Sequence, residues 1–515
     1  MLKPYTLPRL RAGRGKPARR VLAAVLVAAL LAQGPVLAAS VERAGPFTSS
    51  LPNLGDSASD DLSPLAERRI GEEIMRQLRG AGEELDDPEV VEYLNQFGLS
   101  LAISAPAGST FEFFAVKDPS INAFALPGGF IGVHSGLLVA AQSESELASV
   151  LAHEMGHVVQ RHIARSLAVQ RESSLVALGA MALAILAARA GNDQVVQAAA
   201  AGGVGFAAQS QLGFSREAER EADRVGFQIL QSAGMDTGGM VTFFGRLQQA
   251  SRYYESAAPA YLRTHPLTSE RIADIQNRIR EGRYRQRADS PEFQLIRARM
   301  RVLQDESGQG LRDVQRLFEE QIKSGQRSSA ASAHYGLAMV LVRQRDLPGA
   351  QRELDRAAAL LPARHAMIDK FAIELAQASP NKANAVVLAQ AARSRYPQSR
   401  MIASAYADAL QQNNRHDDAI AFLRDQLQLY RQEAPLYEKL ARSYSAKGNE
   451  LLEHKSLAEN YYLRGNLRAA LNQLQMARRV GVNDYYEQSQ IDARTRQIQA
   501  LITERERTEK ENPKR

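Results

Sequence analysis

The C-terminal part of the chain repeats a helical pattern with a period of about 35 residues. Ala350, Leu354, Ala357 and Pro362 are spaced by 4, 3 and 5 positions, and the same spacing recurs 35 residues later, over 385–397. Small residues at such positions allow two helices to cross closely. Because one pair of helices cannot bury its own apolar face, the pattern predicts that neighbouring pairs stack into an all-α array.

A further copy of the pattern lies at 461–477, and the period is similar to that of the tetratricopeptide repeat. The resemblance predicts an all-α repeat solenoid over residues 291–495, with a concave groove that can recruit a protein partner. The alternative is an Ala-rich helical bundle in which the spacing is accidental. Residues 496–515 are mostly charged and polar and predict a solvated tail.

The first 38 residues have the pattern of an export signal. They contain seven basic residues and no acid, then an apolar run from Val21 to Ala32 and small residues up to Ala38. These features predict a secretory signal peptide that is cleaved after Ala38. The alternative is an uncleaved anchor in the inner membrane, although a span needs roughly 20 apolar residues. Residues 39–62 are rich in Ser, Pro, Gly and Asp and predict a flexible tether.

The net charge of +7 lies entirely in this N-terminal segment, so it does not indicate binding to nucleic acid. Beyond it, residues 39–290 carry a net formal charge of −8 and residues 291–515 one of +8. This division predicts either electrostatic docking of the two parts or an acidic partner in the groove. Ordinary solvated helix surfaces are the third alternative.

Residues 63–290 have a mixed pattern and predict a mostly helical domain with a small sheet. Phe111–Val116 is rich in aromatic residues, and Asn122–Leu126 alternates before a Pro-Gly-Gly turn, so both segments predict strands. Two apolar runs, 175–188 and 195–208, are too short to span a membrane. The whole segment 175–208 is predicted to be buried helices, a shield over the active site or a peripheral membrane contact.

The sequence His153-Glu154-Met155-Gly156-His157 is an HExxH motif that follows a helix start at Ser143, which forms a capping box with Glu146. On a helix, His153 and His157 lie on the same side and can bind one zinc ion. Glu154 can then face a water molecule on the metal and take its proton as the water attacks a carbonyl. The motif predicts a zinc hydrolase.

Two histidines do not complete a zinc site, and the chain has no cysteine. A second predicted helix, beginning after Ser215, carries Glu219 and Asp223 four residues apart on one side. One carboxylate could bind the metal while the other orients a ligating histidine or donates a proton. The alternative is an exposed charged helix with i,i+4 ion pairs.

Together, the HExxH motif, the segment around Glu219 and Asp223, and the preceding segment 122–138 resemble the HtpX and CAAX-prenyl-protease family of zinc metallopeptidases, metallopeptidase family forty-eight. The resemblance implies a zincin-like α+β fold and one Zn²⁺ per chain. It implies that Glu154 is the general base, that Glu219 is the third zinc ligand and that Asp223 has a supporting role, often as proton donor. The strand residues matched to the substrate edge are Asn122, Ala123, Phe124 and Ala125.

His265, in the sequence Arg-Thr-His-Pro, has two interpretations. It could be a core or capping histidine. In relatives that carry repeats, the matching loop can bring a histidine to the metal, so His265 could be a fourth ligand that keeps the enzyme latent, or could stabilise the oxyanion. His134 and His162 are interpreted as structural, since His162 lies five residues after His157 and would point away from the metal.

The resemblance also predicts location and partners. Relatives with a signal peptide and repeats act in the periplasm of Gram-negative bacteria. Their protein substrates are unfolded or misassembled outer-membrane β-barrel proteins, and they associate with the assembly machinery. The rival hypothesis is a chaperone or scaffold that uses the repeats and in which proteolysis is secondary.

Overall fold

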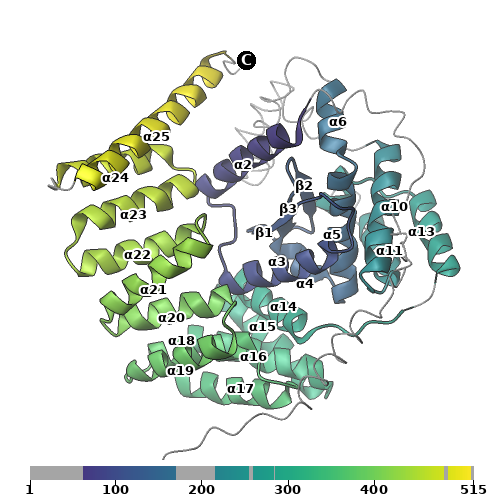
Figure 1. Cartoon of the computed structure of the whole chain (residues 1–515). Helices are drawn as coiled ribbons and strands as arrows, with labels where there is room; N and C mark the ends of the chain where they lie inside the picture. Colours follow the sequence, from purple (N-terminus) through teal and green to yellow (C-terminus); the bar gives the residue numbers. More distant parts are fainter. Residues whose placement is uncertain (1–61, 170–214, 254–258, 283–284, 481–484, 512–515) are drawn as a thin grey trace, which may run out of the picture. The chain divides into compact units, whose positions relative to one another are not determined.

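The computed structural model describes residues 62–169, 215–253, 259–282, 285–480 and 485–511 (Figure 1). The predicted signal peptide, nearly all of the predicted tether and the apolar segment 175–208 lie outside the described residues. Among the described residues, no helix combines the length and apolar character that crossing a membrane requires.

The part before residue 290 is mostly helical, as predicted. Its helices are α2 (Pro64–Gly80), α3 (Pro88–Ala102), α4 (Ser135–Ala140), α5 (Glu144–Val159), α6 (His162–Val169), α10 (Arg216–Ser232), α11 (Gly238–Tyr253), α12 (Ala260–Thr264) and α13 (Ser269–Glu281). The predicted helix starts are confirmed, because the Ser143 and Ser215 hydroxyls accept hydrogen bonds from the amides of Glu146 and Ala218.

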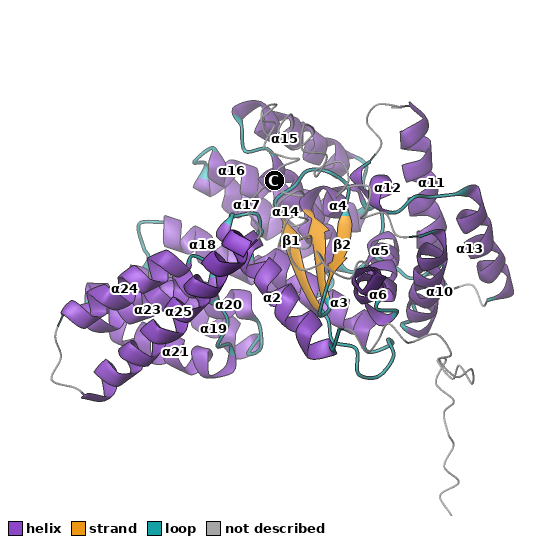
Figure 2. Ribbon diagram, turned by 90° about the horizontal axis from the view of Figure 1, so that it is seen from above, coloured by secondary structure: helices purple, strands orange, loops and turns teal. Residues whose placement is uncertain are grey.

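A three-stranded sheet lies among these helices (Figure 2). The central strand β3 (Phe130–His134) pairs parallel with β1 (Glu112–Val116) and antiparallel with β2 (Ala123–Leu126). Both predicted strands are therefore confirmed. The turn from β2 to β3 uses Gly129 at φ +86°, where a Cβ would lie 1.9 Å from the Thr110 carbonyl oxygen. The buried apolar residues of α2 pack against the sheet.

Two glycines allow α5 and α10 to pack closely. A Cβ on Gly156 would lie 2.6 Å from the carbonyl oxygen of Ala222, and a Cβ on Gly226 would lie 2.9 Å from the backbone of Ala152. Either group would force the two helices apart. Gly156 is the fourth residue of the HExxH motif, so this contact brings the motif directly against the helix that carries Glu219 and Asp223.

From residue 291 the described chain consists of helices joined by short turns, as the repeat pattern predicts. They are α14 (Pro291–Gln304), α15 (Gly308–Lys323), α16 (Arg327–Arg343), α17 (Leu347–Leu360), α18 (Ala366–Ala378), α19 (Ala383–Arg395), α20 (Arg400–Gln412), α21 (His416–Leu429), α22 (Ala434–Ala446), α23 (Glu450–Leu463), α24 (Leu467–Arg479) and α25 (Tyr485–Glu511). The small residues at the repeat spacing are buried at the helix crossings: Ala350, Ala357, Ala385, Ala389, Ala470 and Ala477.

The C-terminal end differs from the sequence prediction. Helix α25 runs through the expected boundary at residue 495, and Ile498 on it is fully buried against α24 and its neighbours. Part of the segment 496–515 is therefore packed helix and not a solvated tail. The many charged residues made the segment look solvent-exposed, although Ile491, Ile498 and Leu501 form an apolar row along the helix.

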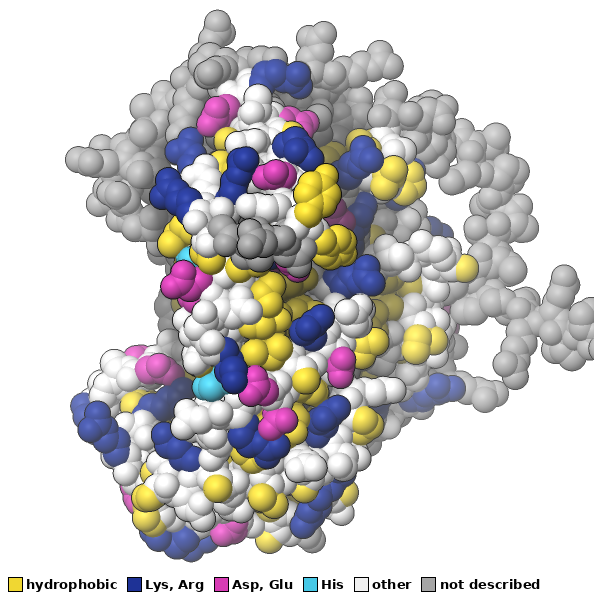
Figure 3. All heavy atoms as spheres, turned by 60° about the vertical axis from the view of Figure 1, so that its left-hand side comes forward, with side chains coloured by type: hydrophobic (Ala, Val, Ile, Leu, Met, Phe, Trp, Pro, Cys, Tyr) yellow, Lys and Arg dark blue, Asp and Glu magenta, His cyan; other side chains and the backbone are white. Residues whose placement is uncertain are grey.

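The acidic start of α3 contacts basic residues of the repeat helices. Arg299 on α14 lies 2.7 Å from Asp87 and 3.0 Å from Glu89, and Lys370 on α18 lies 2.6 Å from Glu89. Glu92 accepts a hydrogen bond from the amide of Met401 at 2.8 Å. These contacts support the docking interpretation of the charge division. On the face shown in Figure 3, Lys and Arg side chains lie among acidic and apolar ones and do not form one continuous basic surface.

Candidate metal centre

Helix α5 holds the HExxH motif in a fully buried position. His153, Glu154 and His157 have no exposed surface. The two histidines are one helical turn apart, and their Nε2 atoms lie 3.1 Å from each other. Both rings therefore point to the same place, as the motif spacing predicts.

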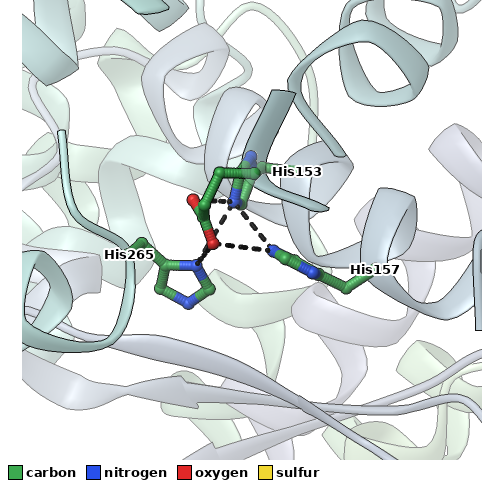
Figure 4. Close-up of side chains that lie close together, drawn as sticks. His153, His157 and His265 are labelled. Carbon is green, nitrogen blue, oxygen red and sulfur yellow. Dashed lines mark hydrogen bonds and ion pairs between the residues drawn. The ribbon is translucent and has the colours of Figure 1, made fainter. Parts of the chain in front are cut away.

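Helix α10 adds a carboxylate to this pair. Glu219 Oε2 lies 3.4 Å from His153 Nε2, and Glu219 Oε1 lies 3.4 Å from His157 Nε2. His265 comes from the turn between α12 and α13, and its Nδ1 lies 3.0 Å from Glu219 Oε1 and 3.3 Å from His153 Nε2. Figure 4 shows the three rings directed toward one another, with dashed lines to the carboxylate.

These four residues fit a tetrahedral zinc ion. One ligand atom from each lies within 4.8 Å of the others. The five separations given above, which involve both oxygens of Glu219, are 3.0–3.4 Å. Ligand atoms about 2.0–2.1 Å from zinc at tetrahedral corners lie about 3.3 Å apart. The chemistry of the atoms agrees, because His153 Nδ1 is engaged with Asp223, which leaves Nε2 of this ring available as a ligand at the point that Nε2 of His157 also faces.

Asp223 is placed behind His153 and not in the ligand set. Its Oδ1 accepts a hydrogen bond from His153 Nδ1 at 2.9 Å, and the Arg271 guanidinium on α13 donates to both of its oxygens, at 2.6 and 2.8 Å. Burial raises the pKa of Asp223, but the hydrogen bonds from Arg271 and His153 outweigh it and lower the pKa. An ionised carboxylate with both oxygens engaged suits the orienting role better than the proton-donor role.

His157 is supported through His162, which its spacing predicted to be structural and to point away from the metal. His162 Nδ1 lies 2.8 Å from His157 Nδ1, and His162 Nε2 lies 2.9 Å from Glu221 Oε2. On a continuous helix, a residue five positions on would be rotated by about 140° away. Helix α5 ends at Val159, however, so that rotation does not apply. His162 is outside the ligand set, as expected, but it contacts a ligating histidine, which the spacing on a continuous helix does not predict.

Glu154 lies beside the cluster and is fully buried. Burial raises its pKa, and this effect outweighs the opposite influence of His265, His153 and the backbone amide of Ala125. His265 Nε2 is 3.4 Å from Glu154 Oε1. A glutamate with a raised pKa is suited to accept and return a proton near neutral pH.

The segment that carries His265 is attached to the start of the edge strand. The Tyr261 amide donates to the Ile121 carbonyl at 3.1 Å, and the Tyr261 ring stacks on His265 with centroids 4.6 Å apart. Tyr261 and Arg271 were not singled out from the sequence. Both lie far along the chain from the motif residues that they support, so no local pattern marks them.

Strand β2 is at the edge of the sheet, next to β3 alone. The His134 amide donates to the Asn122 carbonyl, which makes Asn122 and His134 a hydrogen-bonded pair. Because such pairs alternate with non-hydrogen-bonded ones along antiparallel strands, the backbone groups of Ala123 and Ala125 point away from β3. Phe124 instead pairs with Gly132.

A buried His, His and Glu set of this geometry, with a glutamate beside the metal position, defines a zinc metalloendopeptidase, and the chain is a member of that class. Residues 88–279 match peptidase family M48. Since a relative that is 32% identical covers 94% of this chain, the chain belongs to peptidase family M48.

The β-barrel assembly-enhancing protease of Escherichia coli (strain K12) is 32% identical over 490 residues, which cover 94% of this chain and 97% of that protein. The protein of the same name from Yersinia pestis is 32% identical over 487 residues, covering 93% and 98%. The mitochondrial metalloendopeptidase OMA1 of Schizosaccharomyces pombe is 32% identical over 182 residues, or 35% of this chain and 50% of that protein. The solved tetratricopeptide-repeat domain of P58(IPK) is 12% identical, with 66% of this chain and 98% of that chain covered, and its TM-score is only 0.18.

Proposed function

We propose that the protein is a periplasmic endopeptidase that degrades misassembled outer-membrane β-barrel proteins and assists their assembly. The observation that supports this proposal most strongly is the buried cluster of His153, His157 and Glu219 beside a sheet edge. The relatives from Escherichia coli and Yersinia pestis are named β-barrel assembly-enhancing proteases. The export pattern of residues 1–38 supports the periplasmic location, and the helical repeats support recruitment of protein clients.

The residues have separate tasks in this proposal. His153, His157 and Glu219 hold the zinc ion, and Asp223 keeps His153 in the tautomer that leaves Nε2 free to bind it. When bound, zinc acidifies water and polarises the peptide carbonyl. Glu154 accepts the proton of the attacking water and returns it to the leaving amine.

An extended substrate can add to the sheet along β2. The outward backbone groups of Ala123 and the outward carbonyl of Ala125 would pair with the substrate backbone, and Asn122 and Phe124 flank them. Recognition through backbone groups suits unfolded chains of many sequences, since every peptide offers the same groups. Strand addition at this edge also places the substrate next to Ala125, whose amide faces Glu154.

His265 closes the site at rest. Its side chain is 2% exposed, and the ring supplies the fourth atom of the ligand set. A zinc ion with four protein ligands has no open position for water, so this arrangement is latent. Because the His265 segment is hydrogen-bonded to Ile121, two residues before β2, a strand that adds there would disturb the contact and free the site.

The test of proteolysis uses the purified full-length chain, an unfolded outer-membrane β-barrel protein and the Glu154→Gln variant. We expect the variant to keep its zinc and to cleave roughly 10²- to 10⁴-fold more slowly, because it lacks the general base. Glu217→Gln, at a mostly exposed side chain on α10, is the matched control and should cleave normally. Normal cleavage by Glu154→Gln would contradict the enzyme assignment. Full cellular function of Glu154→Gln would favour the chaperone or scaffold instead.

The test of closure is His265→Ala. We expect this variant to cleave bystander proteins faster than the wild type, because the fourth ligand is removed and water can reach the metal. Unchanged or lower activity, measured on a folded soluble protein as bystander, would count against the closed resting state.

A further inference from the structure

His162 lies against His157 on the Nδ1 side of the ring, opposite the Nε2 atom that faces the metal position. His162 is 2% exposed, and its ring centroid is 4.9 Å from that of His157. The Nδ1 atoms of the two rings are 2.8 Å apart, and the other nitrogen of His162 is 2.9 Å from Glu221 Oε2. Arg165 also donates to Glu221, at 3.0 Å.

A reversal of the backbone puts His162 in this place. Arg161 has φ +51°, in the left-handed region that residues with a side chain seldom adopt. Its guanidinium donates to Glu67 and to the Leu62 carbonyl, so contacts with the start of α2 hold the reversed conformation. Such a conformation persists only where the surrounding structure maintains it. The chain turns back at Arg161 and starts α6 with His162 against His157.

The positions of the protons follow from these contacts once His157 binds a metal through Nε2. His157 can bind a metal through Nε2 only if its proton is on Nδ1, and that proton is then donated to Nδ1 of His162. His162 must therefore carry its own proton on Nε2, which donates it to Glu221. Each hydrogen bond in the series has one donor and one acceptor, and the series ends on a carboxylate.

The arrangement parallels the support of the other ligating histidine. His153 donates from Nδ1 directly to the carboxylate of Asp223. His157 reaches its carboxylate, Glu221, through one intervening imidazole. We propose that His162 and Glu221 are positioning residues of the metal centre, which hold His157 in the tautomer and orientation that bind zinc. This inference deepens the proposed function, since it concerns the same metal site.

The experiment measures zinc affinity of the full-length chain by competition with a chromogenic chelator, without substrate. His162→Leu removes the acceptor for His157, and we expect zinc to bind about 10- to 100-fold more weakly. His162→Asn keeps an acceptor near the Nδ1 position and should regain most of the loss. Glu221→Gln leaves His162 in place, so we expect a loss of only a few fold. Glu217→Gln on the same helix is the control and should match the wild type.

Wild-type zinc affinity in His162→Leu would overturn the inference, and so would equal losses in His162→Leu and His162→Asn, which would indicate a packing role. Circular dichroism checks the fold of each variant. If His162→Leu does not fold, Glu221→Gln decides the question, because Glu221 is half-exposed and wild-type affinity there would overturn the inference. Since no substrate is used, failure of the proposed proteolytic function would leave this result unaffected.

Discussion

The metal cluster and the docking cluster, both within the described residues, are buried groups of charged and polar side chains whose charges differ. In the metal cluster, the charged members comprise three carboxylates and one guanidinium: Glu154, Glu219, Asp223 and Arg271. In the docking cluster between α3 and the repeats, two carboxylates face two cations: Asp87, Glu89, Arg299 and Lys370. With neutral histidines, the first cluster carries a formal charge of −2 and the second of zero.

This difference in charge distinguishes a metal-binding site from a structural contact. A buried charge is costly unless it is paired, so a cluster that supplies its own counter-charges is stable as it stands. The docking cluster meets this condition. With its histidines neutral, as zinc ligands must be, the metal cluster lacks two positive charges at the point where the ligand atoms of His153, His157 and Glu219 meet, and one Zn²⁺ ion would provide them. In the metal-free chain a proton on His153 supplies one of the two.

The largest expected effect comes from changing the charge of the metal cluster. Glu219→Gln keeps the shape of the side chain but removes one negative charge and one ligand. We expect zinc affinity to fall by more than about 100-fold and proteolysis to fall with it. Substitution of residues that only hydrogen-bond to zinc ligands already lowers zinc affinity about 10- to 100-fold. Chelator competition measures the loss, and Glu217→Gln is the control. Stoichiometric zinc at wild-type affinity in Glu219→Gln would contradict the assignment of Glu219 as a zinc ligand.

A smaller effect, on stability and not on zinc, is expected from the docking cluster. Arg299→Met removes the cation that faces Asp87 and Glu89, and loss of one partner of a buried ion pair costs about 3–5 kcal/mol. Urea unfolding followed by circular dichroism measures this change. The exposed Arg316→Met is the control, with an expected change of less than about 1 kcal/mol. Weaker zinc binding in Arg299→Met would show that the two clusters are not independent.

The smallest effect concerns the competition of protons with zinc. Burial lowers the pKa of His153, but hydrogen bonds and charges from Asp223 and Glu219 outweigh it and raise the pKa to about 10 in the metal-free chain. Burial lowers the pKa of His157, and Glu219 has a lowered pKa because histidine contacts outweigh its burial. One proton must therefore leave on metal binding. We expect zinc affinity to rise about tenfold per pH unit between about pH 7 and 9.

The same shift has a consequence for the metal-free fold. A raised pKa means that the folded state holds the His153 proton more tightly than the unfolded state. The resulting stabilisation is fully present below about pH 6.5 and is lost as the pH rises through about 10. A zinc affinity that does not change with pH would contradict the predicted protonation of His153.

The sequence predicted the features that depend on neighbouring residues. The HExxH spacing, the serine caps at Ser143 and Ser215, and the strand before the Pro-Gly-Gly turn are local patterns, and the structure confirms each of them. The repeat period predicted the stacked helices for the same reason, because each copy carries its own small residues at the crossing.

Long-range contacts explain what the sequence could not predict. Arg271 reaches Asp223 across 48 residues, and His162 reaches Glu221 across 59. No local pattern marks Glu221, because its partner lies beyond a backbone reversal at Arg161. The roles of Gly156 and Gly226 also depend on how two helices pack, which no single segment reveals.

Zinc K-edge X-ray absorption of the full-length chain tests the central claim most directly. If His153, His157, Glu219 and His265 bind zinc together, we expect one zinc ion per chain, with four nitrogen and oxygen ligands at about 2.0–2.2 Å and imidazole scattering from three histidines. In His265→Ala the scattering should correspond to two histidines, because His153 and His157 remain. A site with six oxygen ligands, or imidazole scattering that is the same in the wild type and in His265→Ala, would contradict the account.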